Sequence, residues 1–230
     1  MEFSFRERHR ENEAEILKVY RTTAKDVDAG ATITPAAEWL IDNHYIVEEA
    51  IQEVRRDFPK KFYAQLPTMK VGGMELPRVL VMAWLYVGHT HSTVSREKLT
   101  AITEGFQVHQ PLQIGELWAL PSFLRFVLVE NARRIAVRVA RSRSMRLKAN
   151  EAADEVIRLN DPAASAELLK RLEPLTDDNT FNTQFLYRLR NAPQSQNVAL
   201  EWLEERMRRA GTDAEDVMMA EHNRLSSGNV

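Results

Sequence analysis

Residues 34–58 read TPAAEWLIDNHYIVEEAIQEVRRDF, and their spacing predicts one long amphipathic helix. Thr34 is a favourable N-cap, and Pro35 suits the first helical position because its missing N–H costs nothing there. The apolar residues at helical intervals form one face, which must be buried; they are Leu40, Val47, Ile51, Val54 and Phe58. The helix should end before Pro59.

Similar spacing predicts further helices on both sides of this one. A short helix over residues 10–20 should stop at Asp28-Ala29-Gly30. The segment 59–77 is rich in Pro and Gly and is predicted to be an ordered loop. Residues 78–87 are apolar all round, which is typical of a central helix.

The remaining helices follow from caps and breakers. Ser95 should cap a helix, and another should start near Leu112, bend or break at Pro121, and reach about Lys148. Three more are predicted from Pro162, from a cap at Asp178 or Asn179, and over about 196–210, with a capping box at Thr212 and Glu215 for a last one.

These elements predict an all-α fold, a multi-helix bundle with a smaller C-terminal helical part. We expect an N-terminal helical arm over 1–30, a main helical domain over 31–150 and a smaller helical subdomain over 151–230. The boundary near 150 is inferred from a shift from basic to acidic composition.

Composition narrows the class of protein. The chain has 230 residues, with 31 Lys or Arg against 33 Asp or Glu, a near-balance that argues against a nucleic-acid partner. The absence of Cys excludes disulfides and Cys-based zinc sites. The N-terminus lacks the apolar core of a secretory signal, and the most apolar run is about half the length that a bilayer requires.

A polar cluster on the helix at 34–58 is the first candidate site. Glu38 and Asp42 share one side of the helix, next to Trp39 and Asn43. Carboxylates beside a flat apolar ring suit a sugar, while the same residues could also form a buried network that only fixes helix packing. Two tryptophans and an acid extend the hypothesis: Trp84, Glu116 and Trp118.

A basic segment over 125–148 is the second candidate. It carries eight Arg or Lys and one acid, Glu130, which should pair with Arg134 one turn later. Such a helix can lie on anionic lipid or cover an acidic partner, or it can be a solvated face balanced by the acids at 151–155. The residues predicted to form this membrane or partner face are Arg133, Arg138, Arg141 and Arg143.

Machinery for catalysis was not found in the sequence. Asp26-Val27-Asp28 has the form of a metal-binding motif, but it follows helix-like sequence and not a strand. There is no glycine-rich phosphate loop, nucleophile elbow or Gln-x-x-Arg-Trp motif. We therefore predict no catalytic residue, no cofactor and no metal site in this segment.

Several blocks, in order along the chain, resemble the N-terminal part of cyclic β-1,2-glucan synthases. The blocks lie at 34–43, 51–59, 76–79, 110–119, 129–134 and 220–224. The resemblance implies a segment of a large inner-membrane glucosyltransferase of Gram-negative bacteria, which uses UDP-glucose and a divalent metal outside the region matched here. It also places this segment on the cytoplasmic side of the membrane.

Three functions remain open at this point. The segment could be a non-catalytic scaffold that docks on the transferase domain of the same polypeptide or on the membrane surface. It could instead contact the nascent β-1,2-glucan through the tryptophans and acids named above. The third alternative is an independent helical adaptor protein.

Overall fold

The computed structural model describes residues 4–57, 64–90, 92–108, 110–159, 161–191, 197–211, 215–216 and 219. The chain packs as two compact units. The N-terminal unit comprises Met1–Ala31 and Trp39–Val137, and the C-terminal unit comprises Thr32–Glu38 and Arg138–Val230. The predicted division into 1–30, 31–150 and 151–230 stays a prediction.

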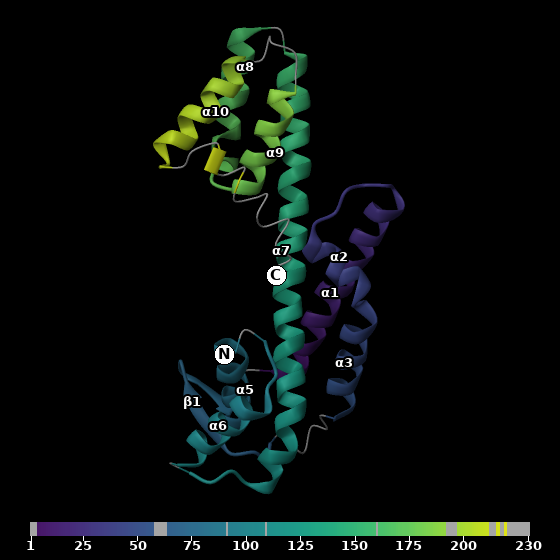
Figure 1. Ribbon diagram of the computed structural model, residues 1–230, viewed down its shortest axis with the longest axis vertical. Coiled ribbons are helices and arrows are strands. Elements are labelled where there is room, and N and C mark those ends of the chain that lie inside the picture. The colour runs from purple at the N-terminus through teal and green to yellow at the C-terminus, as the bar shows by residue number, and fades with distance from the viewer. Residues whose placement is uncertain are drawn as a thin grey trace. The chain divides into compact units, whose positions relative to one another are not determined.

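Helices dominate the N-terminal unit. Its elements are α1 (Phe5–Asp28), α3 (His44–Asp57), β1 (Thr68–Val71), β2 (Met74–Pro77), α5 (Arg78–His89), α6 (Arg96–Gln107) and the first half of α7 (Ile114–Arg158). Figure 1 shows α1 and α3 along one side of this half of α7, with α5, α6 and the β1–β2 hairpin along the other. The all-α fold class is confirmed.

α5 lies at the centre of this unit, as its uniformly apolar sequence predicts. Its side chains from Val79 to Ala83 are all buried, and all of them except Val81 belong to the core cluster that contains Phe123 and Phe126 of α7. Phe5 of α1 joins the same core, with its ring centroid 4.2 Å from that of Phe126. α1, α5 and α7 therefore share one apolar core.

The prediction of one long helix over 34–58 is wrong in one respect. The chain forms two helices there, α2 (Pro35–Asp42) and α3, which are separated at Asn43. The Asn43 side chain donates a hydrogen bond to the carbonyl of Trp39 at 2.9 Å. Such local bonding by asparagine competes with the helix ladder. Thr34 does cap α2, since its hydroxyl accepts from the Ala37 N–H at 3.3 Å.

Two other expectations needed correction. α1 is a helix of 24 residues and not the short one predicted over 10–20. The loop predicted over 59–77 contains the β1–β2 hairpin, while residues 58–63 lie outside the described part of the chain. The hairpin turns at Gly72 and Gly73, whose φ angles of 56° and 81° are those of a type I′ turn.

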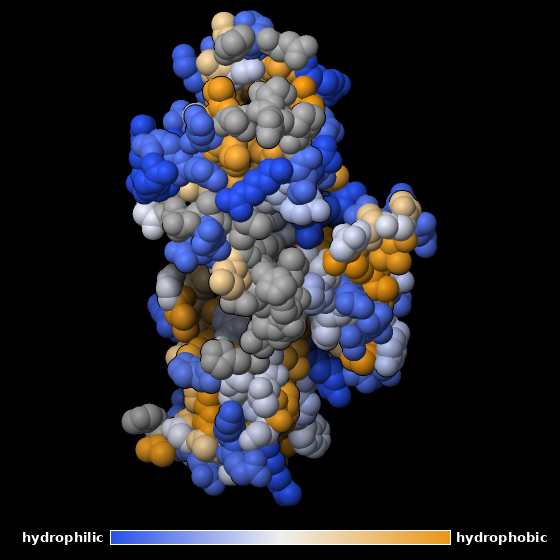
Figure 2. All heavy atoms as spheres, turned by 45° about the horizontal axis from the view of Figure 1, so that its top comes forward, coloured by the Kyte–Doolittle hydropathy of each residue, from blue (hydrophilic) through white to orange (hydrophobic). Residues whose placement is uncertain are grey.

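The C-terminal unit is a helical cluster. It contains the second half of α7, α8 (Pro162–Leu172), a short 3-10 helix (Glu173–Leu175), α9 (Asn179–Arg190) and α10 (Asn197–Arg209). Asp161 and Asp178 cap α8 and α9, so these predicted helix starts are confirmed. Its visible surface carries both hydrophilic and hydrophobic side chains (Figure 2).

The sequence prediction for α7 was too short at its C-terminal end. The helix runs without interruption through Pro121 and continues ten residues beyond Lys148, to Arg158. The compositional shift near 150 therefore falls inside a helix. The predicted capping box cannot be judged, because Thr212 lies outside the described residues.

Candidate functional site

Glu116 is fully buried and forms an ion pair with Arg78, which is also buried. The guanidinium holds both carboxylate oxygens: Nε donates to Oε1 at 2.7 Å and Nη2 donates to Oε2 at 2.6 Å. This two-pronged geometry is the strong form of an Arg–carboxylate pair. Hydrogen bonding to Glu116 raises the pKa of Arg78, against the opposing effect of burial.

The same pair holds the connector between α6 and α7 in place. Arg78 also donates to the carbonyls of Pro111 at 2.7 Å and Gln110 at 3.3 Å. Glu116 accepts from the N–H of Gln113 at 2.9 Å, which satisfies a backbone donor at the start of α7. Glu116 is thus buried with partners inside the protein, and it does not lie on a surface that a glucan could reach.

Glu130 has a comparable structural role. It is buried and accepts from Arg8 Nε at 2.6 Å and from the indole N–H of Trp84 at 3.1 Å. It thereby links α1 and α5 to α7. These partners take the place of the predicted pair with Arg134, which is exposed. Trp84 is half-buried in this network.

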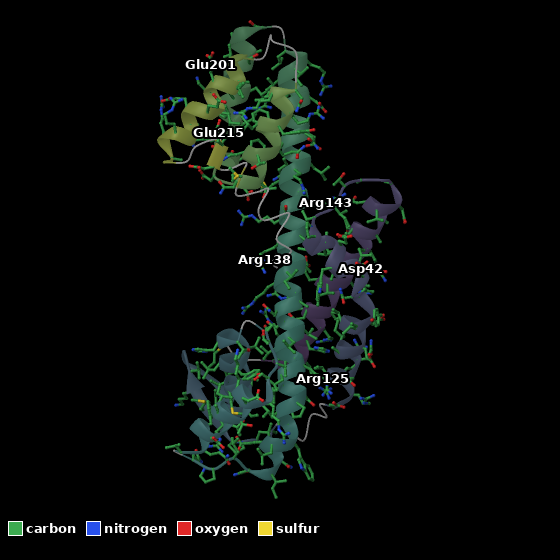
Figure 3. The ribbon with its side chains drawn as sticks, in the orientation of Figure 1. Asp42, Arg125, Arg138, Arg143, Glu201 and Glu215 are labelled. Atoms are coloured by element: carbon green, nitrogen blue, oxygen red, sulfur yellow. The ribbon has the colours of Figure 1, made fainter. Side chains whose placement is uncertain are left out.

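The residues around Trp39 do remain at the surface. Glu38 and Asp42 are exposed, Trp39 is 38% exposed, and Asn43 is half-buried. Asp42 points outward from its helix in Figure 3. Within the described residues, no hydrogen bond or ion pair joins Trp39 or Asp42 to Glu116 or Trp118. The candidate glucan residues therefore do not form one site through direct polar contacts.

An exposed apolar surface that the sequence reasoning missed lies at the start of α7. Trp118 is 77% exposed, Ile114 is 69% exposed, and Leu117 between them is also exposed. Val108, which directly follows α6, is exposed as well. We call Ile114, Leu117 and Trp118 of α7 the apolar tip. The spacing of Ile114, Leu117 and Trp118 at i, i+3 and i+4 was the signal that could have revealed it.

The four arginines predicted to form a basic face have different surroundings. Arg141 pairs with Asp178 at 3.0 Å, and Asp178 also caps α9 by accepting from the Thr180 N–H. Arg133 is half-buried.

Arg138 is exposed and Arg143 is half-buried, and the two leave α7 on different sides (Figure 3). Five residues turn a helix by roughly 140° beyond a full turn, so they do not share a face. Arg141 serves the packing of the C-terminal unit, and whether the others meet a membrane or partner stays a prediction.

Polar side chains occur at several points along the contact between α1 and α3. Nε2 of His9 is 3.0 Å from the carbonyl of Ile51, and burial lowers the pKa of His9 below its ordinary value. His44 stacks on Tyr20 with ring centroids 3.6 Å apart, and burial lowers its pKa as well. Asn12 is fully buried, and neither polar atom of its side chain has a hydrogen-bond partner in the structure. Both histidines contact the neighbouring helix, and their burial there favours the neutral imidazole.

Two structural features do not occur among the described residues. No three His, Asp or Glu side chains among them lie close enough together to hold a metal ion. None of the described helices combines the length and apolar character that a membrane crossing requires.

The chain is similar to a much longer protein. No family model matches it. The cyclic β-(1,2)-glucan synthase NdvB of Rhizobium meliloti (strain 1021) is 66% identical to it over 227 residues, which is 99% of this chain. Those residues span 8% of that protein's length. The resemblance to cyclic β-1,2-glucan synthases inferred from the sequence blocks is confirmed.

Proposed function

We propose that this chain, which matches a cyclic β-1,2-glucan synthase over nearly its whole length, is the N-terminal segment of such an enzyme and serves it as a non-catalytic helical scaffold. It docks on the transferase domain of the same polypeptide, on the cytoplasmic side of the inner membrane. UDP-glucose and a divalent metal belong to the chemistry of that domain.

The proposal rests on the observation that the carboxylates of Glu116 and Glu130 are buried and paired. Glu116 and Glu130 are both held by arginines in the N-terminal unit, and Glu130 also accepts from the indole of Trp84. Both carboxylates are buried, so a substrate in solution does not reach them in this conformation. Their chemistry supports a rigid scaffold.

The test uses the Rhizobium meliloti synthase with its matching segment replaced by this chain. Glucan formation from UDP-glucose is measured in membranes, at equal protein levels. We expect deletion of the segment to lower synthesis strongly, and the exchange of exposed acids, by Glu38→Gln with Asp42→Asn, to leave the rate within about twofold. A large loss of rate in the Glu38→Gln, Asp42→Asn variant, with normal protein levels, would show that these acids act in catalysis or in glucan binding, and would contradict a purely structural role.

A glucan contact at Trp39 is the second candidate function, because Trp39 and Asp42 stay exposed on the same short helix. An exposed indole beside a carboxylate can cover a sugar face and bind its hydroxyls. The isolated chain is titrated with linear and cyclic β-1,2-glucans, following tryptophan fluorescence and calorimetric heat. Saturable binding should be lost in Trp39→Ala and kept in Tyr45→Ala, a control that removes another exposed aromatic. Absence of heat at millimolar glucan would remove this candidate.

A further inference from the structure

Ile114, Leu117 and Trp118 of the apolar tip stay exposed, so no described part of the chain covers them. On the first turns of α7, Ile114, Leu117 and Trp118 occupy the exposed side, while Glu116, Ala119 and Leu120 occupy the buried side. Exposed apolar residues that gather in this way mark an interaction surface more often than scattered ones do.

Hydrogen bonds and core packing on the buried side of α7 hold the tip in place. The Arg78–Glu116 pair binds Gln110, Pro111 and Gln113 through backbone groups, and so fixes the connector that leads into α7. The buried side of the same turns packs into the core of the unit through Ala119 and Leu120. A surface that is already ordered loses little conformational entropy when it binds a partner.

Charged residues are rare in the stretch of sequence that contains the tip. From residue 105 to residue 124 the only Asp, Glu, Lys or Arg is Glu116, which is buried against Arg78. The chain as a whole is 28% charged. The centres of protein interfaces are depleted of charge and enriched in tryptophan, whereas a segment that lies on lipid usually adds Lys or Arg beside its apolar face. The composition of the tip thus favours a protein partner over a lipid surface.

The partner follows from the length of the relative. This chain matches 8% of a synthase, so most of that polypeptide lies outside the structure and is tethered to the segment. A tether raises the effective concentration of the partner, so that even a small apolar surface can dock stably.

We propose that the apolar tip docks into an apolar pocket on the remainder of the same longer polypeptide, with Trp118 as the central anchor. This inference rests on the proposed scaffold function and assigns its docking surface. Tryptophan at the centre of such a surface is the residue type that most often contributes the largest share of binding energy. In this proposal the tip positions the segment on its partner, and the basic segment over 125–148 does not.

Cysteine labelling tests the inference, because this chain contributes no cysteine of its own. Ile114→Cys is placed both in the isolated chain and in the Rhizobium meliloti synthase that carries this chain in place of its matching segment. The rate of reaction with a maleimide is measured in each, and the unsubstituted chimera supplies the background. Tyr45→Cys is the matched control, because Tyr45 is 68% exposed and lies outside the tip.

We expect the cysteine at position 114 to react about tenfold more slowly in the chimera than in the isolated chain, and the control to react alike in both. Adding Trp118→Ala should restore fast labelling at position 114, and the protection should persist in detergent micelles. Equal rates at position 114 in the two proteins would overturn the inference. Protection that disappears in detergent and returns in lipid vesicles would also overturn it, in favour of a lipid surface.

The labelling result is separable from the proposed function. If position 114 is unprotected but deletion of the segment still lowers glucan synthesis, the scaffold function stands and its docking surface lies elsewhere. If deletion has no effect on synthesis, the scaffold function fails whatever the labelling shows.

Discussion

Replacing Glu116 with alanine is expected to lower the free energy of unfolding by about 3–5 kcal/mol. The change leaves the buried guanidinium of Arg78 with only the carbonyls of Gln110 and Pro111, and it removes the acceptor of the Gln113 N–H. An unpaired buried charge is far more costly than the loss of an exposed pair, which amounts to about 0–1 kcal/mol. Urea unfolding followed by far-ultraviolet circular dichroism measures the difference.

Two further variants make the measurement decisive. Glu205→Ala removes an exposed glutamate from α10, where it pairs with Arg209 at 2.9 Å, and should cost less than about 1 kcal/mol. The double variant Arg78→Met with Glu116→Leu replaces both charges and should recover most of the loss, because no charge is then left unpaired. If Glu116→Ala lowers the free energy of unfolding no more than Glu205→Ala does, water screens the Arg78–Glu116 ion pair. The argument that this pair holds the start of α7 in place would then be wrong.

Three other predictions concern local features. Asp178→Ala should cost about 1–2 kcal/mol, since it removes the cap of α9 and the partner of Arg141; an unchanged melting temperature would contradict this. Gly73→Val should destabilise the chain by about 1–2 kcal/mol, because its φ of 81° suits glycine, and calorimetry would show the lower melting temperature. Burial lowers the pKa values of His9 and His44 in the folded state, so the unfolded chain binds protons first as pH falls. The free energy of unfolding should therefore be fully retained above about pH 6.5 and decrease as pH drops through the folded pKa values. His9→Gln should flatten this dependence; equal stability of the parent chain at pH 7.5 and pH 5.5 would refute it.

The residue pattern alone predicted most of the helices, because the signals that start, stop and orient a helix act within a few residues. Thr34, Ser95 and Asp178 cap helices through bonds to residues two or three positions away. The uniformly apolar run of α5 can only be accommodated in a core. The break at Asn43 was local as well, but asparagine is compatible with both a helix and its interruption, so the spacing rule did not reveal it.

The tertiary structure decided what the polar and aromatic residues do. Glu116 and Trp118 lie two positions apart in one sequence block, yet one is fully buried and the other is largely exposed. The partner of Glu116 is 38 positions away and that of Glu130 is 122 positions away, so no local pattern could identify either. A carboxylate becomes a structural ion pair or a ligand-binding group according to what the fold places beside it. The sequence by itself determined the helices and the family resemblance, and packing determined which of its conspicuous side chains remain free to meet a partner.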